Sequence, residues 1–222
     1  MKKISLFMMV ILWSLGISAQ VSLDSGNRDA QYVKTIVGRS QKIVDQLAIR
    51  DDAAKESVLH IIANRYFLLN DIHDGYRQEM DRLKQDASVD PSEKKRRQAA
   101  LQDNRDARLY QHHFEFEAGL SRYLTDSQIE QVKDGLTYGV VGVTYKAYAD
   151  MIPTLKDTEK VQIMAWLKEA REFAMDAGDS KAKHAWFGKY KGRINNWLSK
   201  RGYDLTKERQ AWQQRIEARK KN

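Results

Sequence analysis

Residues 51–85 read DDAAKESVLHIIANRYFLLNDIHDGYRQEMDRLKQ, and this stretch decides the fold. Its apolar residues recur every three or four positions, which is the spacing of one face of an α-helix. This stripe consists of Val58, Ile62, Leu69, Ile72, Tyr76, Met80 and Leu83. Around residues 58–69 the stretch is apolar nearly all round, because Leu59, Phe67 and Leu68 lie outside the stripe. We therefore expect a long helix at the centre of a helical bundle.

Helical patterns continue on both sides of this stretch. Apolar spacing and stop signals predict helices over residues 28–48, 158–177, 180–200 and from 205 into the charged tail. Asp90, Pro91 and Glu93 form a start signal for a helix that runs to about Tyr123. Thr125 and Gln128 form a capping box before a further short helix.

The run TYGVVGVTYKAYADM, residues 137–151, differs from the rest of the chain. It is rich in β-branched residues and interrupted by glycines, which favours a strand or an irregular segment. No second strand is available to pair with it, so we expect an irregular buried segment. The sequence predicts an all-α, single-domain bundle of about six or seven helices with this one irregular glycine-containing segment.

Composition agrees with a globular helical protein and excludes several classes of function. The 222 residues are 42% hydrophobic and 31% charged, with only 12 Gly and 2 Pro to interrupt helices. The chain has no Cys, which excludes disulfide scaffolds and thiol nucleophiles. No specific catalytic motif is present, and we expect neither a cofactor nor a bound metal.

The first nineteen residues have the pattern of a signal peptide. Lys2 and Lys3 precede an apolar run from residue 4 to 17, which is too short to span a bilayer, and Ser18 and Ala19 provide a cleavage site. Cleavage after Ala19 would leave residues 20–222 as one helical domain. It would lower the net charge from +8 to +6 by removing two of the 38 basic residues. Export argues against nucleic acid as a partner and leaves acidic glycans, anionic lipid surfaces or acidic proteins.

Three segments carry a resemblance to a known family. They are LTYGVV (136–141), KHAWFGKYKGRINN (183–196) and RGYDL (201–205). They are similar to an exported Bacteroidota family of unknown function, for which sugar binding is a proposed role and whose genes lie near polysaccharide-utilisation genes, pectic ones included. The resemblance implies a Gram-negative periplasm or cell surface. It brings no catalytic residues.

The densest group of titratable residues is His112, His113, Glu115 and Glu117. Residues four apart share a helix face, so His113 and Glu117 should meet and could act as a general base pair. A metal would need further ligands, for which only His73, Asp71 and Asp74 are candidates, and their spacing is not specific. The alternative is a buried histidine whose ring is satisfied by Glu117.

Arg65 lies within the apolar stripe, where a guanidinium without a partner would be costly to bury. We expect an internal ion pair, with Glu117 or Glu130 as candidate acids. The functional alternative is a bidentate grip on a carboxylate of a ligand.

The segment 184–201 carries the candidate binding face. An apolar stripe of Trp186, Tyr190, Ile194 and Trp197 is bordered by Lys189, Arg193, Asn196 and Lys200. Aromatic rings stack on the C–H faces of sugars, and Lys or Arg beside them can pair with uronates. Such a stripe also packs well into a core with its basic edge in water.

These patterns predict a non-catalytic protein that binds an acidic oligosaccharide or polysaccharide. Trp186, Tyr190 and Trp197 would stack on the sugar, while Lys189, Arg193 and Arg65 would pair with its carboxylates. One alternative is a lyase or hydrolase that uses His112 or His113 with Glu117. Another is a periplasmic chaperone, because residues 124–128, LTDSQ, resemble the Leu-Thr-x-x-Gln signature of small helical stress chaperones; the capping box accounts for the same residues.

Overall fold

The computed structural model describes residues 20–221, so the predicted signal peptide lies outside the described range. Within this range the chain forms eight helices and no strand, which confirms the all-α prediction with a slightly higher helix count. The helices are α1 (Ala30–Val44), α2 (Asp52–Gln85), α3 (Pro91–Ser121), α4 (Asp126–Leu136), α5 (Val140–Met151), α6 (Asp157–Met175), α7 (Ser180–Lys200) and α8 (Leu205–Lys221).

Helix α5 corrects the prediction of an irregular segment over residues 137–151. Tyr138 and Gly139 have φ angles of 61° and 66°, and this left-handed turn ends α4 and starts α5. The β-branched residues that follow are helical, and Val141 and Tyr148 are buried. Packing against α6 therefore outweighs the weak helix propensity of this run.

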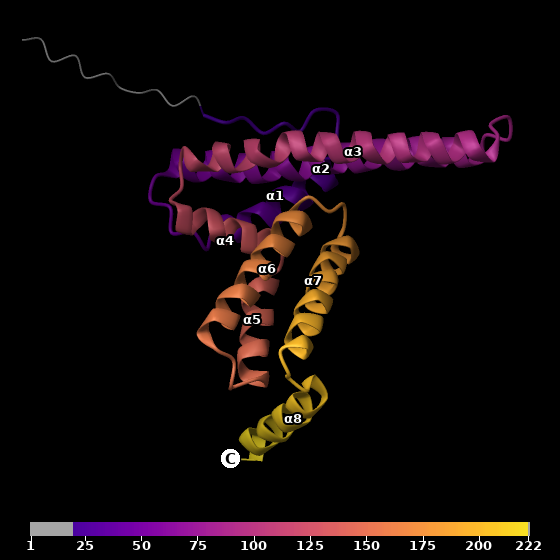
Figure 1. Cartoon of the computed structure of the whole chain (residues 1–222). Coiled ribbons are helices and arrows are strands. Elements are labelled where there is room, and N and C mark those ends of the chain that lie inside the picture. The colour runs from indigo at the N-terminus through magenta and orange to yellow at the C-terminus, as the bar shows by residue number, and fades with distance from the viewer. Residues whose placement is uncertain (1–19, 222) are drawn as a thin grey trace, which may run out of the picture.

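The helices form two groups that meet at an angle (Figure 1). α2 and α3 make a long antiparallel hairpin, and α1 and α4 lie under one half of it. α5, α6 and α7 project away from the hairpin, and α8 lies at their far end. The top of α6 and the α6–α7 turn therefore face the middle of the hairpin.

Each group has its own apolar core. The core of α1–α4 contains Val58, Ile62, Phe116 and Leu120, so the predicted stripe of α2 does lie inward. The core of the second group contains Ile163 and Leu167 of α6 and four residues of α7, which are Phe187, Tyr190, Ile194 and Leu198. No helix among residues 20–221 is long and apolar enough to cross a bilayer.

The predicted helix starts are confirmed. Asp90 accepts hydrogen bonds from the backbone N–H groups of Ser92 and Glu93. Thr125 and Gln128 form the capping box of α4, and the Gln128 side chain also donates to the Leu47 carbonyl oxygen at 2.7 Å. The Leu-Thr-x-x-Gln pattern thus has a complete structural role at a helix start.

Candidate functional site

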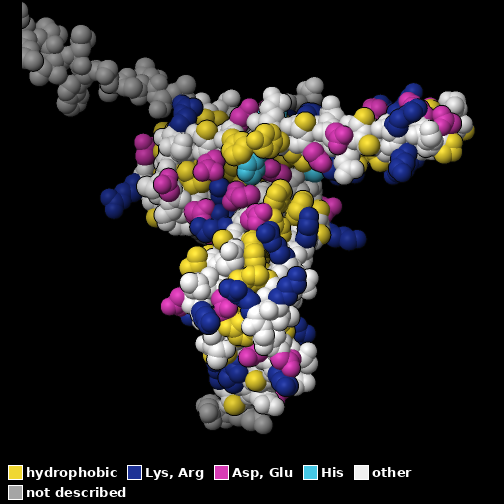
Figure 2. All heavy atoms as spheres, viewed as in Figure 1, with side chains coloured by type: hydrophobic (Ala, Val, Ile, Leu, Met, Phe, Trp, Pro, Cys, Tyr) yellow, Lys and Arg dark blue, Asp and Glu magenta, His cyan; other side chains and the backbone are white. Residues whose placement is uncertain are grey.

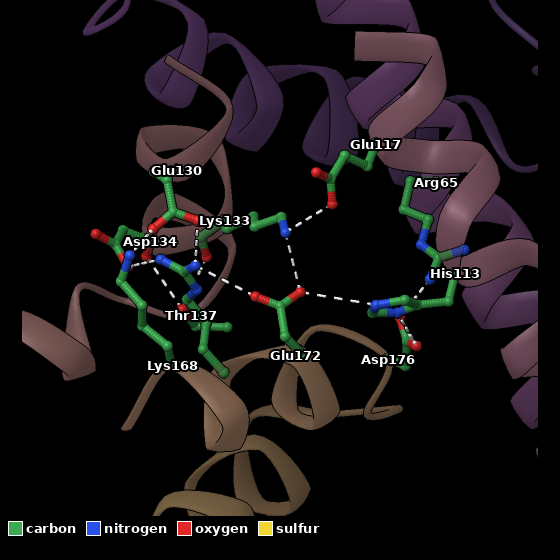
Figure 3. A network of polar contacts seen from close by, with 11 residues as sticks. Arg65, His113, Glu117, Glu130, Lys133, Asp134, Thr137, Lys168, Glu172 and Asp176 are labelled. Atoms are coloured by element: carbon green, nitrogen blue, oxygen red, sulfur yellow. Dashed lines mark hydrogen bonds and ion pairs between the residues drawn. The ribbon is translucent and has the colours of Figure 1, made fainter. Parts of the chain in front are cut away.

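A network of charged side chains lies where the two groups of helices meet (Figure 3). On one side α6 and its C-cap contribute Arg171, Glu172 and Asp176. On the other side α2, α3 and α4 contribute Arg65, His113, Glu117, Glu130, Lys133 and Asp134. Charges buried in this way must be paired, so the junction between the two cores is held by ion pairs as well as by apolar contacts.

Asp176 is the acceptor at one end of this network. It accepts hydrogen bonds from Nη2 of Arg65 and from Nδ1 of His113, the latter at 2.7 Å. Nη1 of Arg65 donates to the carbonyl oxygen of His112 at 2.9 Å. Arg65 does form the expected internal ion pair, but Glu117 and Glu130 were the wrong candidate partners. A guanidinium engaged in this way is not free to grip a ligand.

His113 is oriented by Asp176. An ionised carboxylate can only accept, so Nδ1 of His113 donates, and Nε2 is left to take up or release a proton. Nε2 lies 3.7 Å from Oε2 of Glu172. The hydrogen bond to Asp176 raises the pKa of His113 against the opposing effect of burial, and the charges of Asp176 and Glu172 add to the rise. A histidine held by a carboxylate is the arrangement of a general base.

The predicted contact between His113 and Glu117 is replaced by contacts to other helices. Oε2 of Glu117 accepts from Nζ of Lys133 at 2.8 Å, and Lys133 also donates to Glu172 at 3.1 Å. Burial lowers the pKa of Lys133, but these two carboxylates outweigh it and the pKa is raised. Residues four apart on one helix lie near each other, but here both side chains pair instead with charged residues of other helices.

His112 faces away from this network. Its Nδ1 lies 2.6 Å from Oε2 of the exposed Glu115. His73, considered above as a metal ligand, donates from Nε2 to the carbonyl oxygen of Asp176 at 2.8 Å. In the described part of the chain no group of three or more His, Asp or Glu side chains is arranged to hold a metal ion.

A cleft of about 900 Å³ opens beside the network, between the α2–α3 hairpin and the α6–α7 junction. His113, Glu172 and Asp176 contribute to its lining. Five aromatic residues also line it, which are Tyr76 of α2, Tyr110 and Phe114 of α3, Phe173 of α6 and Trp186 of α7. Figure 2 shows hydrophobic side chains gathered on α3 and again at the top of α6 and α7, with acidic side chains between them. The cleft thus combines aromatic walls with titratable groups.

These aromatic rings are unusually accessible. The exposed fractions of Tyr110, Phe114 and Phe173 are 70%, 59% and 45%. Phe173 stacks on Trp186 with ring centroids 4.6 Å apart and an angle of 17° between the planes. Clustered exposed apolar residues in a concave surface mark a binding site.

The predicted binding face of α7 is divided by the structure. Trp186 lines the cleft, and Nζ of Lys189 lies 4.9 Å from its ring centroid. Tyr190 is buried in the core beneath. Trp197 packs edge-on against Trp166 at 5.1 Å, away from the cleft lining. The apolar stripe is therefore mainly core, and only its first residue reaches the cleft.

Arg193 also lies outside the cleft. Its guanidinium is 4.6 Å from the ring centroid of Trp166, and Nη1 lies 3.3 Å from Oε2 of Glu169. The arginines that line the cleft are Arg77 and Arg105. The carboxylates of Asp106 and Asp179 also contribute to its lining. Of the predicted ligand-binding residues, only Trp186 is in the lining of this cleft, and the assignment of a sugar-binding role stays a prediction.

Sequence reasoning missed Tyr110, Phe114, Phe173, Glu172 and Asp176. A signal for the first two was present, because they lie four residues apart on α3 and outside the buried Phe116–Leu120 face. Apolar residues repeated on the polar face of a helix indicate a surface that binds something. Asp176 carries no such signal, since its role depends on contacts to α2 and α3.

Comparison with protein families gives a match over most of the chain. The profile of a family described as protein of unknown function (DUF3826) covers residues 33–218. The chain belongs to this family. The match spans α1 almost from its start to near the end of α8, so the cleft and the charged network both lie within the DUF3826 region. No curated protein matches the chain. The predicted Bacteroidota origin, export and sugar binding stay predictions.

The raised pKa of His113 predicts how stability depends on pH. The pKa of His113 in the folded protein lies above its unfolded value of about 6.5, so the protonated ring stabilises the fold. This stabilisation is fully present below the unfolded pKa. This stabilisation is lost as the pH rises through the folded pKa. We expect the difference in unfolding free energy between wild type and His113→Gln to shrink from pH 6 to pH 9 in urea titrations.

The matched control for this experiment is His112→Gln, which removes the neighbouring imidazole outside the Asp176 contact. This variant keeps the contact between His113 and Asp176, so the pH-dependent stabilisation by His113 should remain. A difference between wild type and His113→Gln that stays constant with pH would contradict the assigned role of Asp176.

Proposed function

We propose that the cleft between α3 and the α6–α7 junction binds a carbohydrate. On this proposal the DUF3826 protein is a non-catalytic accessory protein of polysaccharide utilisation that acts in the periplasm or at the cell surface. The observation that carries the proposal is the stacked pair of Phe173 and Trp186, which shares the cleft with the exposed rings of Tyr110 and Phe114. Two accessible aromatic surfaces in one cleft offer the flat apolar faces on which sugar rings stack.

The polar lining of the cleft suits a ligand rich in hydroxyl groups. Carboxylates of Glu172, Asp176 and Asp106 can accept hydrogen bonds from hydroxyls, and Arg77 and Arg105 can donate to ring and hydroxyl oxygens. The same two arginines could pair with a uronate, which is how an acidic sugar would be accommodated. Lys189 above Trp186 adds a further cation near the cleft.

Calorimetry with neutral and acidic oligosaccharides tests this proposal. We expect binding to at least one member of the panel, and a loss of about tenfold or more in affinity, about 1.4 kcal/mol, in Trp186→Ala. Trp166→Ala is the matched control, because Trp166 is also half-buried but lies outside the cleft. Equal losses in the two variants, or no binding by wild type, would contradict the proposal.

A specific observation also favours a second function, which is acid–base catalysis on a glycan. The pair of His113 and Asp176 lines the same cleft, and Nε2 of His113 is left available beside Glu172. A hydrolase or lyase would release new reducing or unsaturated ends, detectable by chromatography of the products. Their appearance with wild type and disappearance with His113→Ala would establish catalysis in place of simple binding.

A further inference from the structure

A second cavity, of about 690 Å³, shares a wall with the cleft. The turn at residues 177–179 lines both. The other walls of this second cavity come from α1, α2, the turn around Tyr138 and the beginning of α7. Neither the sequence patterns nor the proposed carbohydrate site make use of it.

Lys183 of α7 lies in the lining of this cavity, and only 6% of the residue is exposed. Its Nζ donates to the carbonyl oxygen of Leu136 at 2.9 Å and lies 5.7 Å and 6.0 Å from the ring centroids of Tyr66 and Tyr138. An ammonium group has three N–H donors, and one is accounted for. Among residues 20–221 the Lys183 ammonium has no ion-pair partner.

Comparison with Lys133 shows what Lys183 lacks. Both ammonium groups are buried, but Lys133 lies between two carboxylates and its pKa is raised. Burial lowers the pKa of Lys183 to about 8, against the raising effect of Asp176, and the charges of Arg65 and Arg39 lower it further. An unpaired buried charge of this kind is costly unless an anion can reach it.

Two further cations line the same cavity. Arg39 and Lys42 extend from α1, are exposed, and have no ion-pair partner among the described residues. The one carboxylate in the lining, Asp179, is engaged as the N-cap of α7 and accepts from the N–H of Ala182 at 2.7 Å. Three cations therefore line this cavity against a single carboxylate, which also caps α7.

We propose that this cavity binds a small organic anion through its carboxylate group, with Lys183 at the buried end and Arg39 and Lys42 at the exposed end. Ammonium and guanidinium groups together would neutralise the carboxylate and supply its hydrogen bonds. The faces of Tyr66 and Tyr138 and the side chain of Leu69 provide apolar surface for the body of the ligand. This site is separate from the carbohydrate cleft and does not rest on that proposal.

Calorimetry at pH 8 with D-glucuronate, D-glucose and inorganic phosphate tests the site. We expect glucuronate to bind and glucose, which lacks the carboxylate, to give no heat. Because the pKa of Lys183 is near 8, ligand binding should also take up about half a proton, seen as a heat that varies with the ionisation enthalpy of the buffer. Binding of phosphate in place of glucuronate, or of neither, would overturn the assignment.

Variants test whether glucuronate binds in this cavity or is attracted only by the net positive charge of the protein. Arg39→Gln lies on the exposed side of α1 and should fold normally, yet bind glucuronate at least tenfold more weakly. Lys183→Met should also weaken binding and abolish the proton uptake. Lys34→Gln removes the same charge from α1 outside the cavity and should bind as wild type does. Wild-type affinity in Arg39→Gln would refute the proposal.

Discussion

The Asp176→Ala variant should lose about 3–5 kcal/mol of unfolding free energy, because it leaves the buried Arg65 without its carboxylate. The side chain of Arg65 is 3% exposed, so its charge would be poorly hydrated in the absence of the Asp176 carboxylate. The remaining hydrogen bond, to the His112 carbonyl oxygen, cannot neutralise a full charge. His113 loses its acceptor in the same variant. Urea unfolding followed by circular dichroism measures the loss.

Asp74→Ala is the matched control for this variant. Asp74 pairs with Arg77 on the exposed surface of α2, where an ion pair contributes about 0–1 kcal/mol. The double variant Arg65→Met/Asp176→Ala should recover part of the stability lost in Asp176→Ala, since it also removes the uncompensated charge. If Asp176→Ala costs no more than Asp74→Ala, the guanidinium of Arg65 does not depend on Asp176.

Arg65 shows which part of this network the sequence predicts. Its position between Ile62 and Leu69 placed a cation on the buried stripe of α2, and that alone predicted an internal partner. The partner is 111 residues away in sequence, and nothing in the local pattern identifies it. Helical periodicity reports which face of a helix is buried, whereas the choice of ion-pair partner depends on how helices pack.

The same signal, a cation at helical spacing with core residues, is present at other positions, among them Arg171 and Lys183. Arg171 lies on the Ile163–Leu167 face of α6, and Lys183 lies four residues before the buried Phe187 of α7. Both cations are buried, and both belong to sites described above. A Lys or Arg at helical spacing with core residues therefore predicts a buried charge, although not its partner.

Predictions from local sequence patterns were wrong where packing between helices determines the structure. The β-branched run after Gly139 forms α5 because Val141 and Tyr148 are buried in the second core. The cleft could not be predicted from the sequence either, because its aromatic residues come from four helices and only Trp186 lies in a segment with an apparent binding pattern. The helix starts at Asp90 and Thr125 were predictable because a cap acts within three residues.

Replacing Arg171 with Met should destabilise the protein by about 2–4 kcal/mol, because this residue joins α6 to α4. Its side chain is 2% exposed and pairs with Glu130, Asp134 and Glu172 at 2.6, 2.8 and 3.2 Å. Without it, three carboxylates would be left close together beside a methionine that can fill the volume but not the charge. The carboxylates are partly exposed and can regain some hydration, which keeps the loss below that for a fully buried charge.

Lys168→Met is the matched control for Arg171→Met, since Lys168 pairs with the same Glu130 from an exposed position and should contribute about 1 kcal/mol or less. Arg171→Lys should recover only part of the stability, because one ammonium cannot span carboxylates on two sides as a planar guanidinium does. Hydrogen exchange should locate the effect, with faster exchange in α4 and α6 and little change at the far end of the α2–α3 hairpin. Uniformly faster exchange would mean that the two groups of helices unfold as one unit and that Arg171 contributes to both cores equally.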